Sequence, residues 1–464
     1  MSQFLDREFM LKNDKGRELY HKYAENLPII DYHCHIDPKE IFEDKPYENI
    51  TEMWLKADHY KWRLMREAGV PEEYITGSMT DHDKFVAFSY ALKSAIGNPL
   101  HHWSHMELKK YFGITAHLTN ESAENIWFLT ETYLRDSALS PRKIIEMSNV
   151  EVVCTTDDPI DSLIWHEKIK EDTTFRVKVL PAFRPDRAVA IEKDDFSEYV
   201  KKLSLVSEVD ISDFKSLKEA LRNRMEYFDC HGCRVSDHGL QYIPYMEADE
   251  SEIDAILMRK LEGNTLTDTE CEKYRTAVLL FLSGEYYERD WVMQLHFGVE
   301  RNINSRMYKA LSADSGFDVI SADTKAGNLS KFLDRVNEKG MPKTVVYSLN
   351  PNDNALIDTV INSFQGELRG KMQHGAAWWF NDSKEGILSQ LKSFSSLGNL
   401  GTFIGMLTDS RSFTSYVRHD YFRRILCSYI GGLVEDGEYP DDSECLKEII
   451  EGISYYNAKE YFGF

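Results

Sequence analysis

The chain has 464 residues, of which 42% are hydrophobic and 28% charged, a composition typical of a folded globular protein. Lysine and arginine number 55, aspartate and glutamate number 77, and the formal net charge is −22. Because so negative a chain repels phosphate backbones and anionic lipid head groups, we expect neither a nucleic-acid partner nor a membrane partner.

The cysteines and the first residues indicate a cellular compartment. Seven cysteines spread along the chain are an odd number, which fits a reducing compartment better than a disulfide framework. Residues 1–19 lack the apolar stretch of a signal peptide, and no later run reaches the ~18 apolar residues of a membrane span. We therefore expect a cytoplasmic protein.

Eight short apolar runs end in polar residues, and stretches with helical periodicity lie between most of them. In chain order, the runs cover residues 27–36, 149–158, 176–186, 233–240, 291–299, 342–350, 371–380 and 401–411. Strands that alternate with helices and carry polar groups at their carboxyl ends predict an α/β fold, a (β/α)8 barrel of the TIM type. An open doubly wound sheet is the alternative, but no glycine-rich phosphate turn follows the first run.

Residues 37–148 separate the first run from the second, which is far more than a strand-to-helix connection needs. Segments 48–69 and 121–139 within this stretch have the periodicity of amphipathic helices. We predict that 37–148 is a helical insertion subdomain between strands 1 and 2 that caps the barrel mouth, and that 1–36 and 149–464 form the barrel.

The first run ends in His33, Cys34 and His35. Because side chains two apart in a strand share a face, His33 and His35 can both point inward. Two neutral imidazoles at this spacing can ligate one divalent metal ion. The alternative is a pair of hydrogen-bonded histidines in a polar core.

The last run offers a partner for these histidines. Asp409 has the same parity as the apolar residues Phe403 and Leu407, so it can face the interior, and Arg411 follows it at the rim. A carboxylate opposite two imidazoles completes a mononuclear metal site, and an arginine fork suits a carboxylate ligand. The alternative is a surface ion pair that caps the next helix.

Long strings of the sequence resemble one family. A barrel with His-x-His on strand 1 and aspartate on strand 8 resembles the amidohydrolase superfamily, and within it the chain resembles the uronate isomerase (glucuronate isomerase) family. The matching strings are DYHCH at 31–35, DHYKWRLMREAGV at 58–70, NPLHHWSHMELKKYFG at 98–113, TTDDP at 155–159, LPAFRPD at 180–186, QLHFG at 294–298, HGAAWWF at 374–380, MLTDSR at 406–411, YVRHDYFRR at 416–424 and NAKEYFGF at 457–464.

This resemblance implies conversion of D-glucuronate to D-fructuronate and of D-galacturonate to D-tagaturonate. A metal-dependent hydrolase of the same superfamily is an alternative, and a catalytically silent sugar-acid binder is a third possibility. The sixth run, 342–350, has no histidine where hydrolases usually carry a ligand, and the fourth, 233–240, has no bridging lysine. Both departures disfavour a binuclear hydrolase.

Isomerisation of an aldose to a ketose moves a proton from C2 to C1 through an enediol, so the site needs a base that reaches both carbons. We predict that Asp409 is this base and that Tyr60 relays a proton to an oxygen. We further predict one divalent metal ion, zinc, at His33, His35 and Asp409, and the sequence leaves open whether catalysis requires it.

Other side chains are predicted to contact the substrate. Arg184 and Arg411 would clamp the uronate carboxylate, because a planar fork matches it. Arg184 has the alternative of capping a helix. The remaining candidates are His59, His296, Trp378 and Trp379. His59 and Tyr60 could instead pack within the insertion, and the two tryptophans could belong to the core.

Two further motifs are predicted to have no catalytic role. His101 and His105 lie four apart on a predicted helix, but no HExxH glutamate stands between them, so we expect them to pack the insertion. Cys230 and Cys233 precede a strand rather than open a helix, so we expect neither redox nor metal function. The uronate would be the small-molecule partner, and we expect a homo-oligomer.

Overall fold

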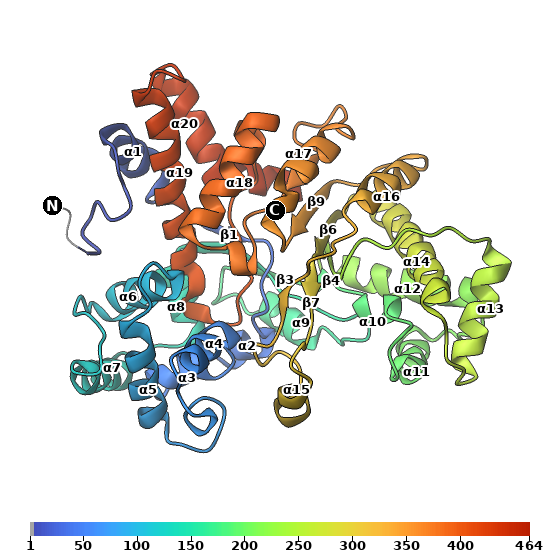
Figure 1. The fold of residues 1–464 in the computed structure, drawn as a ribbon, viewed down its shortest axis with the longest axis horizontal. Coiled ribbons are helices and arrows are strands. Elements are labelled where there is room, and N and C mark those ends of the chain that lie inside the picture. The colour runs from blue at the N-terminus through green and yellow to red at the C-terminus, as the bar shows by residue number, and fades with distance from the viewer. Residues whose placement is uncertain (1–3) are drawn as a thin grey trace.

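Two parallel sheets form the centre of the computed structural model, which describes residues 4–464 (Figure 1). The first sheet has the order β1-β2-β3, with bounds Ile29–Asp31, Val150–Cys154 and Lys178–Leu180. The second has the order β10-β9-β6-β5-β4, with bounds Met372–His374, Thr344–Ser348, Val292–Phe297, Val235–Gly239 and Ala182–Phe183. All of these strands pair in parallel, because helices between them return the chain to the starting edge.

The two sheets meet at Pro181, the single residue between β3 and β4. Proline has no N–H to donate to a strand ladder, so pairing is interrupted there. Beyond it, Asp157 continues the ladder: its N–H donates to Ala182 O at 3.0 Å, and its carbonyl accepts from the Arg184 N–H at 2.9 Å. The run 176–186 therefore pairs with β2 through its first half and with β5 through its second half.

Seven of the eight predicted runs contain these strands, and the prediction of a strand at 401–411 is wrong. Gly405 and Asp409 have φ angles of 77° and 45°, which no regular strand accommodates. The segment still runs beside the end of the first run. The Asp409 N–H donates to His33 O at 3.2 Å, and the His35 N–H donates to Ser410 O at 3.0 Å.

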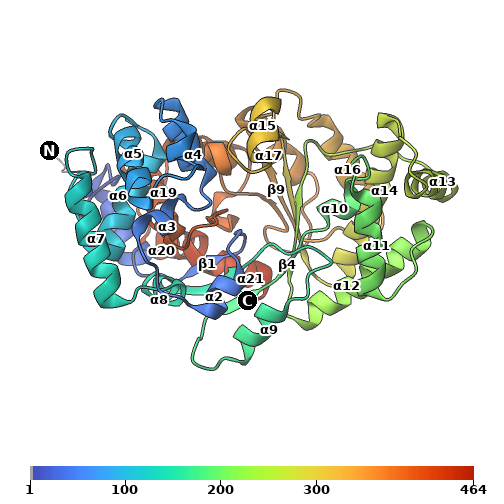
Figure 2. The same ribbon diagram turned by 90° about the horizontal axis from the view of Figure 1, so that it is seen from below.

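The segment between β1 and β2 is helical, as its periodicity predicts. Its α-helices are α2 (Pro38–Glu43), α3 (Ile50–Leu55), α4 (His59–Glu67), α5 (Asp81–Lys93), α6 (Pro99–Phe112), α7 (Ala123–Ser137) and α8 (Pro141–Met147). Five of them begin after a polar residue whose side chain accepts a hydrogen bond from the first turn: Asp37, Asn49, Asp58, Thr80 and Asn98. These helices gather at one side of the molecule, where α6 packs against α19 (Val417–Glu435) (Figure 2).

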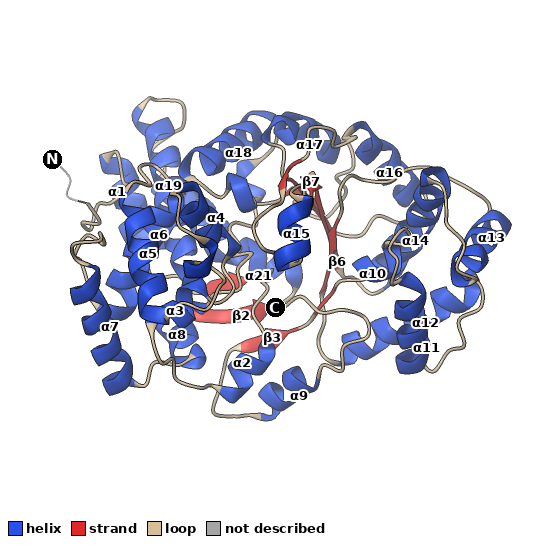
Figure 3. Ribbon diagram, turned by 60° about the horizontal axis from the view of Figure 1, so that its bottom comes forward, coloured by secondary structure: helices blue, strands red, loops and turns tan. Residues whose placement is uncertain are grey.

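The other helices surround the strands (Figure 3). They are α1 (Asp14–Leu19), α9 (Ile164–Glu171), α10 (Asp186–Val189), α11 (Phe196–Ser207), α12 (Phe214–Cys230), α13 (Glu250–Leu261), α14 (Asp268–Glu288), α16 (Gly327–Asn337), α17 (Asn354–Asn362), α18 (Lys384–Leu397), α20 (Ser443–Glu451) and α21 (Asn457–Phe462). Under this cover β6 and β9 are buried along their whole length. Among residues 4–464, no helix combines the length and apolar character that crossing a bilayer requires.

One small element was not predicted. β7 (Val299–Glu300) and β8 (Val319–Ile320) form an antiparallel pair, and the connection between them carries α15 (Ser305–Leu311). We refer to residues 300–320 as the β7–β8 segment. The run 291–299 predicts only the strand that precedes it, because two-residue strands leave no periodicity to detect.

Gly405 shows how closely the last run is packed, and it can be tested. A Cβ added at Gly405 would lie 2.1 Å from the backbone oxygen of Ile453, whereas a Cβ at Gly437, which has nearly the same φ, would meet nothing within 4 Å. We expect Gly405→Ala to destabilise the protein by about 3 kcal/mol and Gly437→Ala by about 1 kcal/mol, because only the first adds overpacking to backbone strain. Thermal unfolding of both variants measures this, and equal losses would contradict the close approach.

Candidate active site

A cavity of about 510 Å³ lies at the carboxyl ends of the strands and collects every site residue predicted from the sequence. These ten residues are His33, His35, His59, Tyr60, Arg184, His296, Trp378, Trp379, Asp409 and Arg411. They come from the first run, the insertion and four later runs. Polar ends of parallel strands meet at one face, which is why residues so distant in sequence share one cavity.

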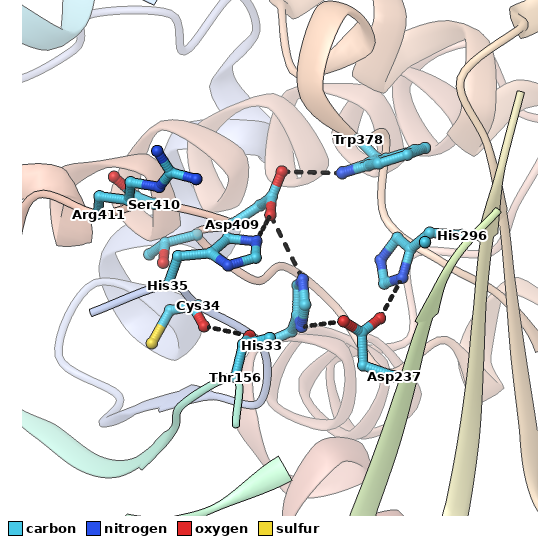
Figure 4. Close-up of polar contacts among 12 residues, drawn as sticks. His33, Cys34, His35, Thr156, Asp237, His296, Trp378, Asp409, Ser410 and Arg411 are labelled. Atoms are coloured by element: carbon cyan, nitrogen blue, oxygen red, sulfur yellow. Dashed lines mark hydrogen bonds and ion pairs between the residues drawn. The ribbon is translucent and has the colours of Figure 1, made fainter. Parts of the chain in front are cut away.

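Asp409 lies between the two histidines of the first run (Figure 4). Its Oδ1 is 3.3 Å from His33 Nε2 and 3.1 Å from His35 Nε2. The other oxygen, Oδ2, accepts a hydrogen bond from Trp378 Nε1 at 2.8 Å. Trp378 therefore contacts the central carboxylate in addition to lining the cavity.

The charge and backbone of Asp409 are both unusual. Burial would raise the pKa of this carboxyl, but hydrogen bonds from His33 and His35 hold it well below its usual range, so the side chain is a carboxylate. Its φ of 45° lies in the left-handed region, which aspartate tolerates better than most residues. Such strain is found mostly where a fold must aim a functional group.

The donor set of His33, His35 and Asp409 fits a divalent metal ion. Two imidazole nitrogens and a carboxylate oxygen are the ligands that zinc accepts at sites with an open position. Ligand atoms about 2.0–2.2 Å from a tetrahedral zinc lie roughly 3.3 Å from one another, close to the two nitrogen–oxygen separations above. These three residues are therefore able to hold one ion, and the geometry leaves its identity open.

Asp237, on β5, is a fully buried acidic residue that the sequence analysis missed. Its Oδ1 is 2.7 Å from His296 Nδ1, and its Oδ2 is 2.9 Å from Arg184 Nη1. Burial would raise its pKa, but the charge of Arg184 holds the pKa well below its usual range. The polar end of the run 233–240 was the available signal, because Asp237 stands there between Ser236 and His238.

Asp237 also belongs to a second group of possible metal ligands, with His33 and His296. Arg184 disfavours a cation there, because its guanidinium already forms an ion pair with the same carboxylate. His33 Nδ1 lies 4.0 Å from Asp237 Oδ2, too far for a hydrogen bond, so Asp237 acts through its charge on the imidazole whose opposite nitrogen faces Asp409. The arrangement favours one metal ion rather than two.

His296 presents a free nitrogen to the cavity. Its ring stacks on Tyr347 at 4.1 Å between centroids and on His33 at 4.7 Å, and its Nδ1 is bound to Asp237. Within residues 4–464, its buried Nε2 has no hydrogen-bond partner. A buried polar atom without a partner is costly, so this nitrogen is well placed to bind a polar ligand atom.

The insertion contributes His59 and Tyr60 through the first turn of α4. Asp58 caps this helix, since its carboxylate accepts from the N–H groups of Tyr60 at 2.9 Å and Lys61 at 3.2 Å. The rings of His59 and Tyr60 lie 5.4 and 6.4 Å from Trp379. Burial, assisted by the charge of Asp409, raises the pKa of Tyr60 well above its usual value, so its hydroxyl is neutral and can donate a hydrogen bond.

Arg418 was also not predicted as a site residue, although it lies in the string 416–424 that resembles the family. It lies on α19, is 3% exposed, and its guanidinium packs 5.4 Å from the centre of the Tyr60 ring. Its Nη1 donates to Asp382 Oδ2 at 3.1 Å and to Thr408 O at 2.9 Å. Asp382 could not be recognised as the partner from sequence alone, because 36 residues separate the two.

The two predicted carboxylate-binding arginines have different surroundings. Arg184 is mostly buried and paired with two carboxylates, Asp186 at 2.8 Å and Asp237 at 2.9 Å. Arg411 has a side chain that is 36% exposed, and its Nη2 donates to Asp314 at 2.8 Å. Asp314 lies on the β7–β8 segment, which sequence analysis did not connect with the site.

His101 and His105 lie in a third histidine group, together with His117. Both ring nitrogens of His105 bind backbone atoms: Nδ1 is 2.6 Å from His101 O, and Nε2 accepts from the Leu118 N–H at 2.9 Å. The two bonds leave His105 no free ligand atom, which supports the predicted packing role. None of the seven cysteines, all within the described residues, forms a disulfide, and Cys233 is buried.

Comparisons with known proteins point to one family. A family model described as glucuronate isomerase matches residues 1–462. A uronate isomerase of Lachnospira eligens is 50% identical over all of both chains, and one of Clostridium acetobutylicum is 51% identical over all of this chain and 99% of its own. The solved uronate isomerase of Thermotoga maritima has a TM-score of 0.94 and 35% identity over 99% of this chain and 100% of its own. A solved glucuronate isomerase from Caulobacter crescentus, 23% identical, shares the fold with a TM-score of 0.90 over 100% of this chain and 97% of its own.

The pairing of Asp237 with Arg184 generates a stability prediction. We expect Asp237→Asn to lower the free energy of unfolding by about 3 kcal/mol, because it removes a fully buried partner of a mostly buried arginine. Asp186→Asn is the matched control, since Asp186 pairs with the same arginine but is 26% exposed, and we expect a loss below about 1 kcal/mol. Denaturant unfolding measures both losses, and similar values would show that burial of Asp237 carries no special weight.

Proposed function

Because the chain belongs to the glucuronate isomerase family, we propose that it interconverts D-glucuronate and D-fructuronate, and D-galacturonate and D-tagaturonate. Both reactions convert an aldose to a ketose. The observation that carries the proposal is a single cavity in which a carboxylate lies between two imidazoles and two arginines can meet an anionic sugar. No observation favours the hydrolase or the silent binder.

In this proposal, Asp409 removes the proton from C2 and returns it to C1. The carboxylate is ionised at neutral pH, and its contacts with His33, His35 and Trp378 fix its position. A positioned carboxylate that reaches both carbons is what transfer through an enediol requires. The neutral hydroxyl of Tyr60 is suited to donate a proton to the substrate oxygen as charge develops there.

His33, His35 and Asp409 would hold one zinc ion, which when bound polarises a substrate oxygen. Asp237 would support this site by placing a negative charge on the opposite side of the His33 ring. His296 would bind a substrate hydroxyl through its unpartnered Nε2. Trp378, Trp379 and His59 would line the sugar ring on the side of the insertion.

Arg411 is the better placed of the two arginines to bind the uronate carboxylate. Its guanidinium is partly exposed at the cavity and paired with one residue, whereas Arg184 already has two carboxylate partners. We infer that Arg184 contributes mainly a fixed positive charge beside the substrate. A planar fork on Arg411 can bind both oxygens of a carboxylate, which lysine cannot do.

We also infer a (β/α)8 barrel made of 1–36 and 149–464, of which residues 1–3 lie outside the described part. Its support is the strand order within the two sheets, the bridge between Asp157 and Phe183 that joins them, and the backbone hydrogen bonds between the first run and residues 409–410. Cavity residues from α4 and the turn before it support a capping role for the insertion 37–148. A cytoplasmic location is consistent with seven free cysteines, and the homo-oligomer stays a prediction.

The function is tested by incubating the protein with D-glucuronate and D-galacturonate and following loss of the aldehyde. We expect both to be isomerised and Asp409→Asn to lower the rate by about 10²–10⁴, since a positioned base contributes about this much. Asp323→Asn, an exposed change outside the cavity, is the control.

Because Asp409 is also a predicted metal ligand, Asp409→Asn and the wild type are compared at equal metal content. Exchange of the substrate's C2 hydrogen with solvent is measured on the same samples. An Asp409→Asn protein that retains metal and still isomerises within tenfold of the wild type would move the base role to another group. Absence of isomerisation by the metal-loaded wild type would reject the proposed function.

Metal content gives a separate prediction. We expect about one equivalent of divalent metal per chain after dialysis, because the ligand atoms of His33, His35 and Asp409 already lie at suitable separations. The double variant His33→Ala, His35→Ala should lose it, whereas His82→Ala, which removes an exposed histidine on α5, should keep it. Full metal content in the double variant would exclude this site.

A further inference from the structure

The β7–β8 segment places the carboxylate of Asp314 beside Arg411, the arginine proposed to bind the anionic substrate. Asp314 lines the same cavity as His35 and Asp409, and its Oδ2 accepts a hydrogen bond from Arg411 Nη2 at 2.8 Å. Arg411 follows Asp409 by two residues, so this ion pair lies at the edge of the proposed catalytic group. In the free protein, Arg411 is thus paired with a carboxylate, the same chemical group that the uronate would present to it.

Asp314 is not needed to hold the segment in place. A second aspartate, Asp318, does so: its Oδ1 accepts from the Asn302 N–H at 2.8 Å, and its Oδ2 is 3.0 Å from Arg301 Nη1. Its backbone oxygen accepts from Arg63 Nη1 at 2.9 Å, which ties the segment to α4. Asp318 is 5% exposed, whereas the side chain of Asp314 is 47% exposed.

We propose that Asp314 occupies Arg411 in the free protein and that the carboxylate of the uronate displaces it on binding. The proposal rests on the proposed function for the assignment of Arg411. Asp314 then competes with the uronate carboxylate for Arg411. It sets the affinity for uronates without contact with the reacting carbons.

The geometry allows this exchange without leaving a charge unpaired. Asp314 binds Arg411 through one nitrogen, and a free carboxylate can approach the guanidinium so that both of its oxygens accept hydrogen bonds. The displaced Asp314 keeps a partner, because its Oδ1 lies 3.8 Å from Arg301 Nη1. Arg301 is fixed by Asp318, so it can receive Asp314 without moving the base of the segment.

The pair that must be broken is weak, which suits a step repeated at every turnover. Both side chains are more than a third exposed, and water screens the attraction between exposed charges. An uncharged sugar has no group to replace Asp314, so its binding leaves Arg411 with its internal partner. The exchange therefore occurs only with substrates that carry a negatively charged group.

The test compares Asp314→Asn and Asp323→Asn as metal-loaded full-length protein with D-glucuronate. We expect Asp314→Asn to lower KM about twofold to fivefold, the range that loss of an exposed competing ion pair allows, and to change kcat less than twofold. Asparagine tolerates the left-handed backbone of Asp314, whose φ is 57°, so the change removes the charge without adding strain. Asp323→Asn, which changes an exposed residue that follows β8 in the chain, should change neither constant.

A second arm separates this competition from a structural effect. In an Arg411→Lys background, which by itself should raise KM, adding Asp314→Asn should lower KM by less than in the wild type, because the residues act through each other. An unchanged or higher KM in Asp314→Asn, or equal effects in both backgrounds, would overturn the proposal. If Arg411→Lys leaves KM unchanged while the wild type isomerises, the assignment of Arg411 is wrong, which is a different outcome.

Discussion

One buried carboxylate organises the cavity. Asp237 is inaccessible to water, and an isolated charge in such a place would be strongly unfavourable. Its charge is compensated by Arg184 and His296, and His33 lies close by. The ends of β4, β5 and β6 and the residues after β1 therefore meet around Asp237. The requirement to neutralise Asp237 thus fixes the position of His296 and Arg184 before any ligand is present.

The insertion depends on a constraint of a different kind. Tyr60 reaches the cavity because α4 starts one residue earlier, and that start is fixed by the Asp58 carboxylate. Asp58 is itself paired with the buried Lys61 at 2.7 Å. The helix cap and this ion pair therefore orient Tyr60 toward the cavity at the strand ends. Arg418, on α19, packs against the Tyr60 ring.

Periodicity and spacing predicted much of this arrangement. The strand runs follow one another in the two sheets in the order the sequence suggests, and His33, His35 and Asp409 do lie together, although the parity argument for Asp409 assumed a strand that the structure lacks. The run 401–411 was wrong as a strand because the backbone angles of Gly405 and Asp409 leave no trace in a hydropathy pattern. Asp237, Arg418 and Asp314 were missed for another reason. Each is recognisable only through a partner from another part of the chain, and a single sequence does not record such pairs.

The left-handed backbone of Asp409 limits which residues this position can accept during evolution or redesign. A β-branched or bulky side chain at a φ of 45° would be strained whatever its chemistry, and glycine, asparagine and aspartate are the residues that adopt this conformation most readily. Of these three, only aspartate carries a charge that can accept a proton. The backbone therefore disfavours glutamate and β-branched residues as simple replacements, and a change of reaction on this scaffold is easier to begin at a neighbouring position.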